Sequence, residues 1–172
     1  MRRIDEIIVH CTASPEGRHV TVKDVDNWHR ARGWNGIGYH YLIYLDGSVH
    51  KGRPIERQGA HCATGGHNRH SIGVCYAGGC AKDGKTPKDT RTPEQKEALR
   101  QLLKDLLRQF PNATIHGHRE FVCKRIQKGV CSCCAECPHN KAICLLADKA
   151  CPSFAVSEYA DLQPKNDKTV QK

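Results

Sequence analysis

The segment Ile4-Asp5-Glu6-Ile7-Ile8-Val9-His10 (residues 4–10) decides the fold class of this 172-residue chain. Its short apolar run, Ile7-Ile8-Val9, is typical of a strand buried inside a sheet, and His10 follows at the end of that strand. Acidic residues interrupt the apolar stretch behind Met1-Arg2-Arg3, so the beginning of the chain lacks the pattern of a signal peptide. We therefore expect a first core strand, and cytoplasmic synthesis without a signal peptide.

Helix and turn signals follow this strand. Thr21, with Asp24 three residues later, predicts a helix start, and Gly33 is expected to end that helix. Asp46-Gly47 lies between two apolar runs and is a strong short-range signal for a hairpin. The two strands that it joins are predicted at residues 39–45 and 48–51.

The second half of the chain again alternates strands and helices. Residues 71–76 are an apolar strand, and the polar stretch 82–91 is expected to be a surface loop. Thr92-Pro93-Glu94-Gln95 is a capping box with proline at the first helical position, so a long helix should begin there. The apolar face of that helix, which we assign to the core, consists of Leu99, Leu102, Leu103, Leu106, Leu107 and Phe110. Residues 113–116 predict a further strand that delivers His118 just past its end, and a short last helix is expected after Pro152.

This order of elements predicts an α/β fold, with a mixed central β-sheet flanked by helices in one domain at residues 1–162. The polar residues 163–172 are expected to form a frayed tail. No apolar run approaches the length of a membrane span, so we expect no membrane partner. We also expect a monomer.

The formal net charge of +9 indicates either an anionic partner or simply a soluble basic surface. Anionic polymers of the bacterial wall fit this charge as well as nucleic acid does. The Lys and Arg residues are scattered and are not interleaved with aromatic residues, so no nucleic acid is expected as a partner.

Histidines follow two of the predicted strands, where a sheet can bring side chains together. His10 ends the first strand, and His118 lies beyond a later one. Zinc hydrolases need three protein ligands and an open fourth position, and imidazole suits zinc. The HExxH helix of the common metalloproteases is absent, so these separate histidines are the candidates for such a site.

Six motifs, in order along the chain, resemble the Amidase_2 family of N-acetylmuramoyl-L-alanine amidases, which includes small phage amidases and peptidoglycan recognition proteins. The resemblance runs from about Ile4 to Tyr159. It rests on Val9-His10-Cys11-Thr12-Ala13, Gly38-Tyr39-His40-Tyr41, Gly59-Ala60-His61, Asn68-Arg69-His70-Ser71-Ile72-Gly73-Val74, Gly117-His118-Arg119-Glu120 and Lys149-Ala150-Cys151-Pro152-Ser153-Phe154.

The resemblance implies one catalytic zinc ion bound by His10, His118 and Cys151, and it matches Tyr39 and Lys149 to catalytic residues of the phage enzymes. Zinc would polarise the scissile carbonyl and supply hydroxide, while the cationic Lys149 would stabilise the developing oxyanion. The Tyr39 hydroxyl would position the water or relay its proton to the leaving amine.

The matched motifs also suggest residues that bind substrate and a branch of the family. His61 and Asn68 match positions that line the substrate groove, and Thr12 and His67 are further candidates. Hydrogen bonds within loops would explain these four residues almost equally well. Cys75 stands where other relatives carry a glutamate, which leaves the general base open, with Glu120 as one candidate.

The implied activity is hydrolysis of the amide bond between N-acetylmuramic acid and L-alanine in bacterial peptidoglycan, as in an endolysin. The alternatives are a non-catalytic peptidoglycan-binding receptor of the same fold and a cytoplasmic amidase that recycles soluble muropeptides. Receptors of this fold typically lack a zinc ligand, and this chain keeps all three. An endolysin without a secretion signal would act on the cell wall after release by a pore-forming partner.

A cysteine-rich insertion at residues 121–147 separates the motif around His118 from the motif around Cys151. Cys134 and Cys137 have the spacing of a metal knuckle, so a second, structural zinc is one interpretation and disulfides are the other. The cysteines concerned are Cys123, Cys131, Cys133, Cys134, Cys137 and Cys144. Outside the insertion, Cys11, Cys75 and Cys80 are expected to be small buried apolar residues.

Overall fold

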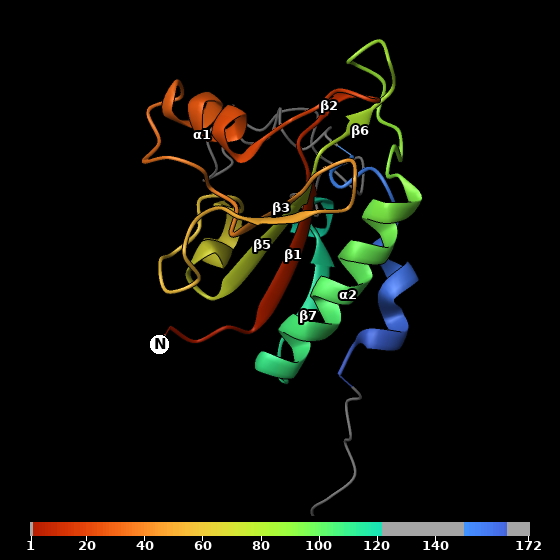
Figure 1. Ribbon diagram of the computed structural model, residues 1–172. Coiled ribbons are helices and arrows are strands. Elements are labelled where there is room, and N and C mark those ends of the chain that lie inside the picture. Colours follow the sequence, from red (N-terminus) through yellow and green to blue (C-terminus); the bar gives the residue numbers. More distant parts are fainter. Residues whose placement is uncertain (1, 122–149, 165–172) are drawn as a thin grey trace, which may run out of the picture.

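The computed structural model describes residues 2–121 and 150–164, whose strands form a five-stranded sheet in the order β4-β3-β5-β1-β7 (Figure 1). β1 pairs in parallel with β5 and with β7, β3 pairs in parallel with β5, and β4 is antiparallel to β3. This is the predicted mixed sheet. The strands are β1 (Glu6–Cys11), β3 (Tyr41–Ile43), β4 (Val49–Lys51), β5 (Ser71–Tyr76) and β7 (Thr114–Gly117).

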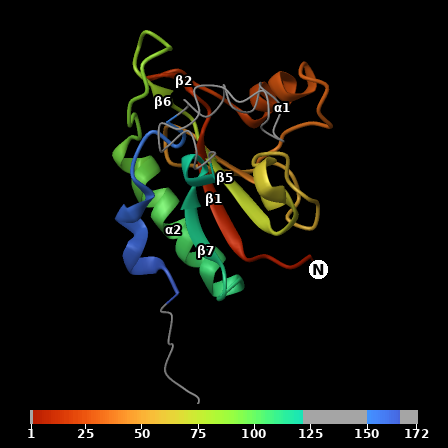
Figure 2. The ribbon, with the colours of Figure 1, turned by 180° about the vertical axis from the view of Figure 1, so that it is seen from behind.

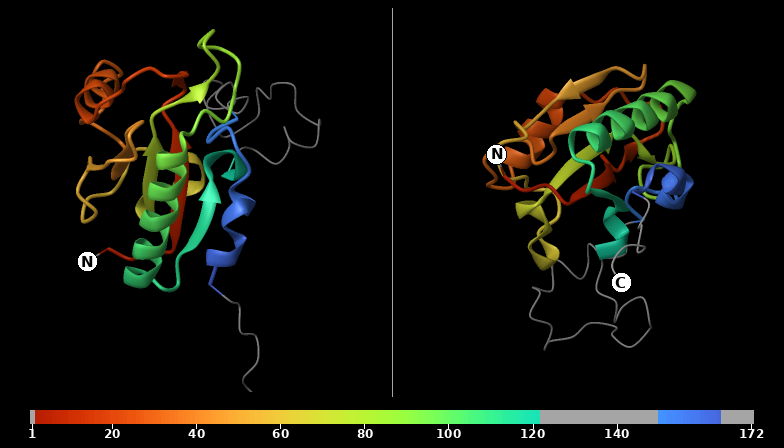
Figure 3. Two further views of the ribbon diagram at one scale, coloured as in Figure 1. Left: turned by 45° about the vertical axis from the view of Figure 1, so that its right-hand side comes forward. Right: turned by 90° about the horizontal axis from the view of Figure 1, so that it is seen from below.

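One face of the sheet is covered by α2 (Pro93–Gln109), the long predicted helix. Thr92 and Gln95 form its capping box, as expected, and Leu99, Leu103 and Leu106 are buried. They join one apolar cluster with residues of β1, β5 and β7, which explains why a leucine-rich helix packs here. Seen from below, α2 lies on one face while η1 (Thr64–Arg69) and η2 (His118–Phe121) lie on the other (Figure 3).

The pleat of β1 divides its side chains between these two faces. Ile7, Val9 and Cys11 belong to the apolar cluster beneath α2. Because successive side chains of a strand point to opposite faces, Ile8 and His10 face away from α2. Figure 2, seen from behind, shows this second face with η1 beside β5.

A smaller apolar cluster supports α1 (Val22–Arg30) near the ends of the strands (Figure 1). Thr21 and Asp24 form the predicted capping box, and the helix ends three residues before Gly33. The members of the cluster are Val20, Val25, Ile37, Leu42, Cys75 and Ala77. The hairpin of β3 and β4 turns at Asp46-Gly47 as predicted, and Gly47 adopts the left-handed conformation (φ 82°) that this turn requires.

Several boundaries differ from the sequence predictions. The first strand runs to Cys11, so His10 is its second-last residue, and β3 begins only at Tyr41, which leaves Tyr39 ahead of the strand. The last helix is the 3-10 segment η4 (Val156–Leu162). The short pair β2 (Ser14–Pro15) and β6 (Gly79–Cys80) was not predicted, because two-residue strands carry no periodic signal.

Within the part of the chain that the structure describes, no helix has the length and apolar character needed to cross a membrane. Lys149 and the tail beyond residue 164 lie outside the described residues, as does nearly all of the predicted insertion.

Candidate metal centre

The three predicted zinc ligands meet at the carboxyl ends of β1 and β7. His10 lies near the end of β1, His118 directly follows β7, and Val9 pairs with Gly117, so the parallel register places the two histidines side by side. Cys151 reaches the same point from the far end of the described chain. The ligand atoms of His10, His118 and Cys151 all lie within 4.8 Å of one another. His10 and Cys151 are buried, and His118 is half-buried.

The spacing of these atoms fits a zinc ion. The Nδ1 atom of His10 lies 3.8 Å from the Sγ atom of Cys151. Zinc bonds of ordinary length at a tetrahedral angle would place a nitrogen and a sulfur ligand about 3.6 Å apart. Two imidazoles and one thiolate are zinc donors, and three protein ligands leave a fourth position for a reacting molecule. The residues present therefore fit a catalytic zinc site.

His10 and Cys151 are both held in their uncharged forms in the absence of a cation. Burial, followed by the nearby His118, lowers the pKa of His10 well below its usual value, so its imidazole is neutral and free to bind metal. Contact with the Cys11 thiol, together with burial, raises the pKa of Cys151. A cation in this position would stabilise the Cys151 thiolate, which is the form that binds metal.

Backbone hydrogen bonds fix the segment that carries Cys151. The Arg119 N–H donates to the Cys151 carbonyl (2.8 Å), and the Tyr76 hydroxyl donates to the Pro152 carbonyl (2.6 Å). Cys11 N–H points at the Cys151 sulfur at 3.4 Å. Since Cys11 and Tyr76 belong to neighbouring strands β1 and β5, the sheet itself holds the third ligand in place.

His61 lies directly behind His10. Only 7% of its surface is exposed, and its Nδ1 atom lies 3.0 Å from His10 Nε2, on the side of the ring opposite to Cys151. On its far side, His61 Nε2 lies 3.4 Å from the Ser71 hydroxyl, which donates to the His67 carbonyl at 2.6 Å. If His10 Nδ1 binds metal, the Nε2–H of His10 donates to His61 Nδ1. The Nε2–H of His61 then points to the Ser71 hydroxyl oxygen.

Two glycines make room for the His61 ring. A Cβ atom at Gly59 would lie 2.4 Å from His61 Cδ2, and one at Gly73 would lie 2.5 Å from the same atom. Gly59 belongs to a loop and Gly73 to β5, so two separate parts of the backbone pack closely against the ring. Any side chain at either position would displace His61 from His10.

Tyr39 lies on another side of His10. The ring centroids of Tyr39 and His10 are 5.1 Å apart, and those of Tyr39 and His29 are 5.4 Å apart. Burial, and then the neighbouring thiols of Cys75 and Cys151, raise the pKa of the Tyr39 hydroxyl well above its usual value. The hydroxyl therefore stays protonated at neutral pH and can act as a hydrogen-bond donor, with the Cys75 thiol as its neighbour in the structure.

The other three predicted substrate-binding residues make hydrogen bonds with their surroundings. Asn68 Oδ1 accepts from the backbone N–H groups of His61 (2.9 Å) and Cys62 (2.8 Å). Thr12 Oγ1 accepts from Gly78 N–H (2.9 Å). His67 lies 2.7 Å from Glu6 at the opposite end of β1 from His10. Substrate contact by Thr12, His61, Asn68 and His67 stays a prediction.

The predicted cysteines divide between buried positions and residues outside the description. Cys11, Cys75 and Cys80 are buried, as expected of small apolar residues. Lys149 and the insertion cysteines Cys123, Cys131, Cys133, Cys134, Cys137 and Cys144 lie outside the described residues, so their roles stay predictions.

His29 is the residue that sequence reasoning overlooked. It is buried on the inner side of α1, one helical turn after Val25, and its ring contacts Tyr39. Burial, and then the nearby Arg32, lower its pKa to about 4, and its Nδ1 accepts from Gly38 N–H at 2.9 Å. Its position four residues after the core residue Val25 places it on the same side of the helix, and this spacing could have identified it as buried.

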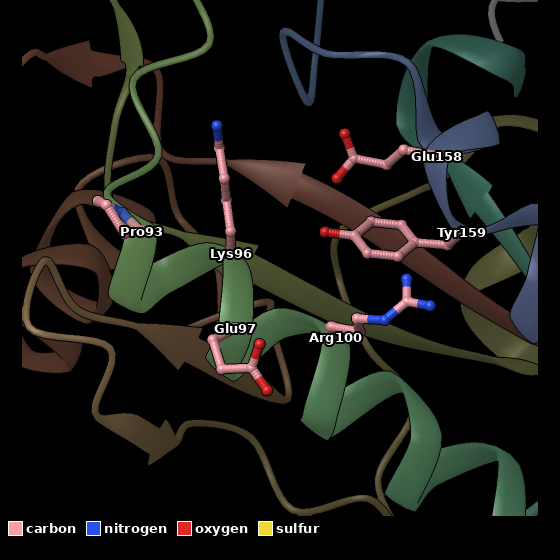
Figure 4. A pocket seen from close by; sticks show the side chains of 6 residues that line it. All are labelled: Pro93, Lys96, Glu97, Arg100, Glu158 and Tyr159. Atoms are coloured by element: carbon pink, nitrogen blue, oxygen red, sulfur yellow. The ribbon is translucent and has the colours of Figure 1, made fainter.

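A hollow of about 410 Å³ lies elsewhere on the molecule, between α2 and η4 (Figure 4). Lys96, Glu97 and Arg100 line it from α2, and Glu158 and Tyr159 line it from η4. It shares no residue with the metal centre. Charged side chains on an open surface explain its lining without a ligand.

Comparisons with known proteins point to one family. The family model N-acetylmuramoyl-L-alanine amidase (Amidase_2) matches residues 1–152. The endolysin of Escherichia phage T7 is 34% identical over 155 residues, which cover 90% of this chain and 84% of the relative. The endolysin of Klebsiella phage KP32 is 33% identical over 154 residues, with 90% and 83% coverage.

Solved structures share the fold. The amidase LysCS, an endolysin from Clostridium intestinale, superposes with a TM-score of 0.58 at 29% identity, covering 81% of this chain and 78% of that one. A structure of tracheal cytotoxin bound to the peptidoglycan recognition proteins LCa and LCx gives a TM-score of 0.58 at 30% identity, with 73% and 76% coverage.

Proposed function

This chain belongs to the N-acetylmuramoyl-L-alanine amidase family (Amidase_2), and we propose that it is a zinc-dependent enzyme that cleaves bacterial peptidoglycan. The bond hydrolysed is the amide between the lactyl group of N-acetylmuramic acid and L-alanine. The observation that carries the proposal is the convergence of His10, His118 and Cys151 within 4.8 Å.

His10, His118 and Cys151 would hold the zinc ion. When bound, zinc supplies a Lewis acid for the scissile carbonyl and lowers the pKa of the attacking water. In the net reaction, the hydroxyl of water is added to the carbonyl carbon, the carbon–nitrogen bond breaks, and the L-alanine nitrogen takes up a proton.

Tyr39 and Lys149 supply the polar groups for this reaction. The protonated Tyr39 hydroxyl, adjacent to His10, donates a hydrogen bond to the reacting carbonyl or passes a proton to the leaving amine. Lys149, two residues before Cys151, stabilises the negative charge that develops on the carbonyl oxygen. The role of Lys149 rests on its match to the family motif.

His61 acts as a positioning residue in this proposal. Its contact with His10 Nε2 fixes the tautomer and the orientation of the ligand ring, as partners behind zinc-bound histidines commonly do. This role accounts for its burial and for the glycines packed against it.

Peptidoglycan, or the soluble muropeptides derived from it, is the proposed partner. Relatives named endolysin and a neighbour that binds tracheal cytotoxin support this class of substrate. The net charge of +9 would favour adhesion to an anionic wall. We propose that the protein acts as a monomer on the cell wall after release from the cell, in the manner of an endolysin.

The test is the chemistry of the products. Purified protein incubated with intact peptidoglycan should create new L-alanine amino termini and no new reducing sugar ends, and a chelator should abolish the reaction. Binding without release of peptide would instead indicate the receptor function. Cleavage of soluble muropeptides with no action on intact wall would indicate recycling, and new reducing ends alone would refute the amidase proposal.

A further inference from the structure

A second group of metal-binding side chains lies at the other end of β1. Glu6 begins β1, His67 belongs to η1, and His70 connects η1 to β5. The backbone fixes this arrangement, because Glu6 pairs with Ser71 and the Asp5 N–H donates to the His70 carbonyl at 2.8 Å. The strand pairing therefore brings Glu6 next to the segment that carries both His67 and His70.

The donor atoms of Glu6, His67 and His70 lie within 4.8 Å of one another. Glu6 Oε2 lies 2.7 Å from His67 Nδ1 and 3.6 Å from His70 Nδ1. The first distance is a hydrogen bond, and the second is too long for one. Two ligands of one tetrahedral zinc ion lie about 3.3 Å apart. Both Glu6–histidine distances differ from this value by less than 1 Å, so small side-chain movements would bring the three donor atoms to zinc-binding positions.

The Nδ1 atom of His70 is buried and has no hydrogen-bond partner, the one such side-chain atom within the described segments. An unsatisfied buried nitrogen is unfavourable unless another group satisfies it. The side chains remain reachable from solvent, since 14% of Glu6, 22% of His67 and 34% of His70 is exposed. A cation entering from solvent would satisfy His70 Nδ1 and neutralise Glu6.

We propose that Glu6, His67 and His70 form a second binding site for Zn²⁺, separate from the metal centre at His10. Two imidazoles and a carboxylate are a donor set suited to zinc, without the thiolate of the first centre. Glu6 and His10 are four residues apart on one strand, which corresponds to about 13 Å. The two sites therefore do not share an ion.

The second ion would also restrict the movement of η2, the short helix that begins with His118. The His67 ring packs on Phe121, with ring centroids 3.9 Å apart. Phe121 is the last residue of η2, and His118 is its first. Zinc at the second site would hold the His67 ring, and through Phe121 the short helix that carries a ligand of the first site.

The experiment counts zinc in the reduced, full-length protein. Wild type, His70→Asn and Glu6→Gln are equilibrated with Zn²⁺ alone and analysed for bound metal. Both variants should bind one zinc fewer than wild type, because each removes a donor. Any zinc at the His10 centre or on the insertion cysteines stays in all three proteins and cancels in the difference. Glu97→Gln is the matched control, because Glu97 lies on the exposed side of α2, outside the donor set, and loses the same charge as Glu6→Gln.

Thermal melting and cobalt spectra give two further readouts. Added zinc should raise the Tm of wild type and Glu97→Gln by more than it raises the Tm of His70→Asn, because an ion that binds the folded state stabilises it. When both proteins are loaded with cobalt, the spectrum of wild type minus that of His70→Asn should contain no thiolate-to-cobalt band, because the proposed site has no cysteine ligand. Equal zinc counts in wild type, His70→Asn and Glu6→Gln, all folded by circular dichroism, would overturn the proposal and leave Glu6 as a plain partner of His67.

Discussion

The two faces of the central sheet use the same strands for different purposes. Beneath α2, Ile7 and Val9 pack with Leu99 and Leu103 in a continuous apolar cluster. On the opposite face, His10 approaches His61, and a smaller apolar cluster lies beneath α1. Because side chains of β1 alternate between the two faces, this one strand contributes both core residues and a candidate metal ligand. Changes on one face should mainly affect stability, and changes on the other should mainly affect metal binding and rate.

Buried imidazoles are tolerated on the second face because each has a backbone or side-chain partner. His40 Nδ1 accepts from Gly73 N–H at 2.9 Å, and burial lowers the pKa of His40 to about 4, so the ring is neutral at pH 7. His29 is held in the same way by Gly38 N–H. A buried polar group costs little when it is hydrogen-bonded. His29, His40 and His61 are thus neutral rings held close to the metal centre at His10.

The largest effect is expected from Tyr39→Phe on the second face. Loss of the hydroxyl should lower kcat by about 10²–10⁴-fold, which is the usual contribution of a positioned proton donor. The ring still packs between His10 and His29, so zinc content and the free energy of unfolding should stay near wild type. Turnover of peptidoglycan, metal analysis and urea denaturation measure the three quantities. Wild-type turnover in Tyr39→Phe would remove this residue from the mechanism.

Leu103→Ala tests the first face. Leu103 is fully buried beneath α2, so truncation should lower the free energy of unfolding by about 2–5 kcal/mol. Below the melting transition, zinc content and kcat should be unchanged. Glu97→Ala, on the exposed side of the same helix, is the control and should change stability little. If Leu103→Ala loses zinc while still folded, the two faces are coupled, and the claim that changes beneath α2 mainly affect stability is wrong.

His61→Ala gives a smaller effect on the opposite face. Loss of the partner behind a zinc-bound histidine should weaken zinc affinity about 10–100-fold, or about 1.4–2.7 kcal/mol. Competition with a chelating dye measures this affinity. His61→Gln, which can still accept a hydrogen bond from His10, should recover part of the loss. A variant that binds zinc normally but has a raised KM would instead support the substrate-binding role that the sequence suggested.

The smallest effect concerns the acid stability of the α2 side of the molecule. The Arg91 side chain, 1% exposed, donates to both oxygens of Asp89 at 2.8 Å. This hydrogen bonding holds the pKa of Asp89 below its usual value. A carboxyl whose pKa is lowered by folding adds stability above its unfolded pKa of about 3.9, and that stability is lost as pH falls through the folded value. In urea titrations, Asp89→Asn should therefore show a weaker loss of stability in acid than wild type. An equal pH dependence would mean that the Arg91 contact contributes nothing measurable.

Local sequence signals were sufficient for most of the fold. Thr21 and Thr92 mark the helix starts because capping boxes depend on residues only three positions apart. The leucine pattern from Leu99 to Leu106 identified the inner side of α2. Tyr39, in contrast, was placed inside a strand that begins only at Tyr41, since strand ends depend on pairing with β5 and β4 rather than on local preference.

The candidate site required more than local signals. His10, His118 and Cys151 were proposed as a set through motif order, and the parallel register of β1 and β7 then explains why they meet. The contact of His61 with His10 has no signature in the sequence, because it depends on a loop that folds back over Gly73. The same holds for Glu6 and His70, which the pairing of β1 with β5 brings together.

Anomalous diffraction at the zinc edge, from crystals of the active protein, tests the metal centre most directly. We expect a zinc peak bonded to His10 Nδ1, His118 and Cys151 Sγ at about 2.0–2.3 Å, with His10 Nε2 still facing His61. The same peak should disappear in Cys151→Ser, together with the release of L-alanine termini. A protein that cleaves peptidoglycan while its zinc lies elsewhere and no metal contacts His10 would contradict the proposed function.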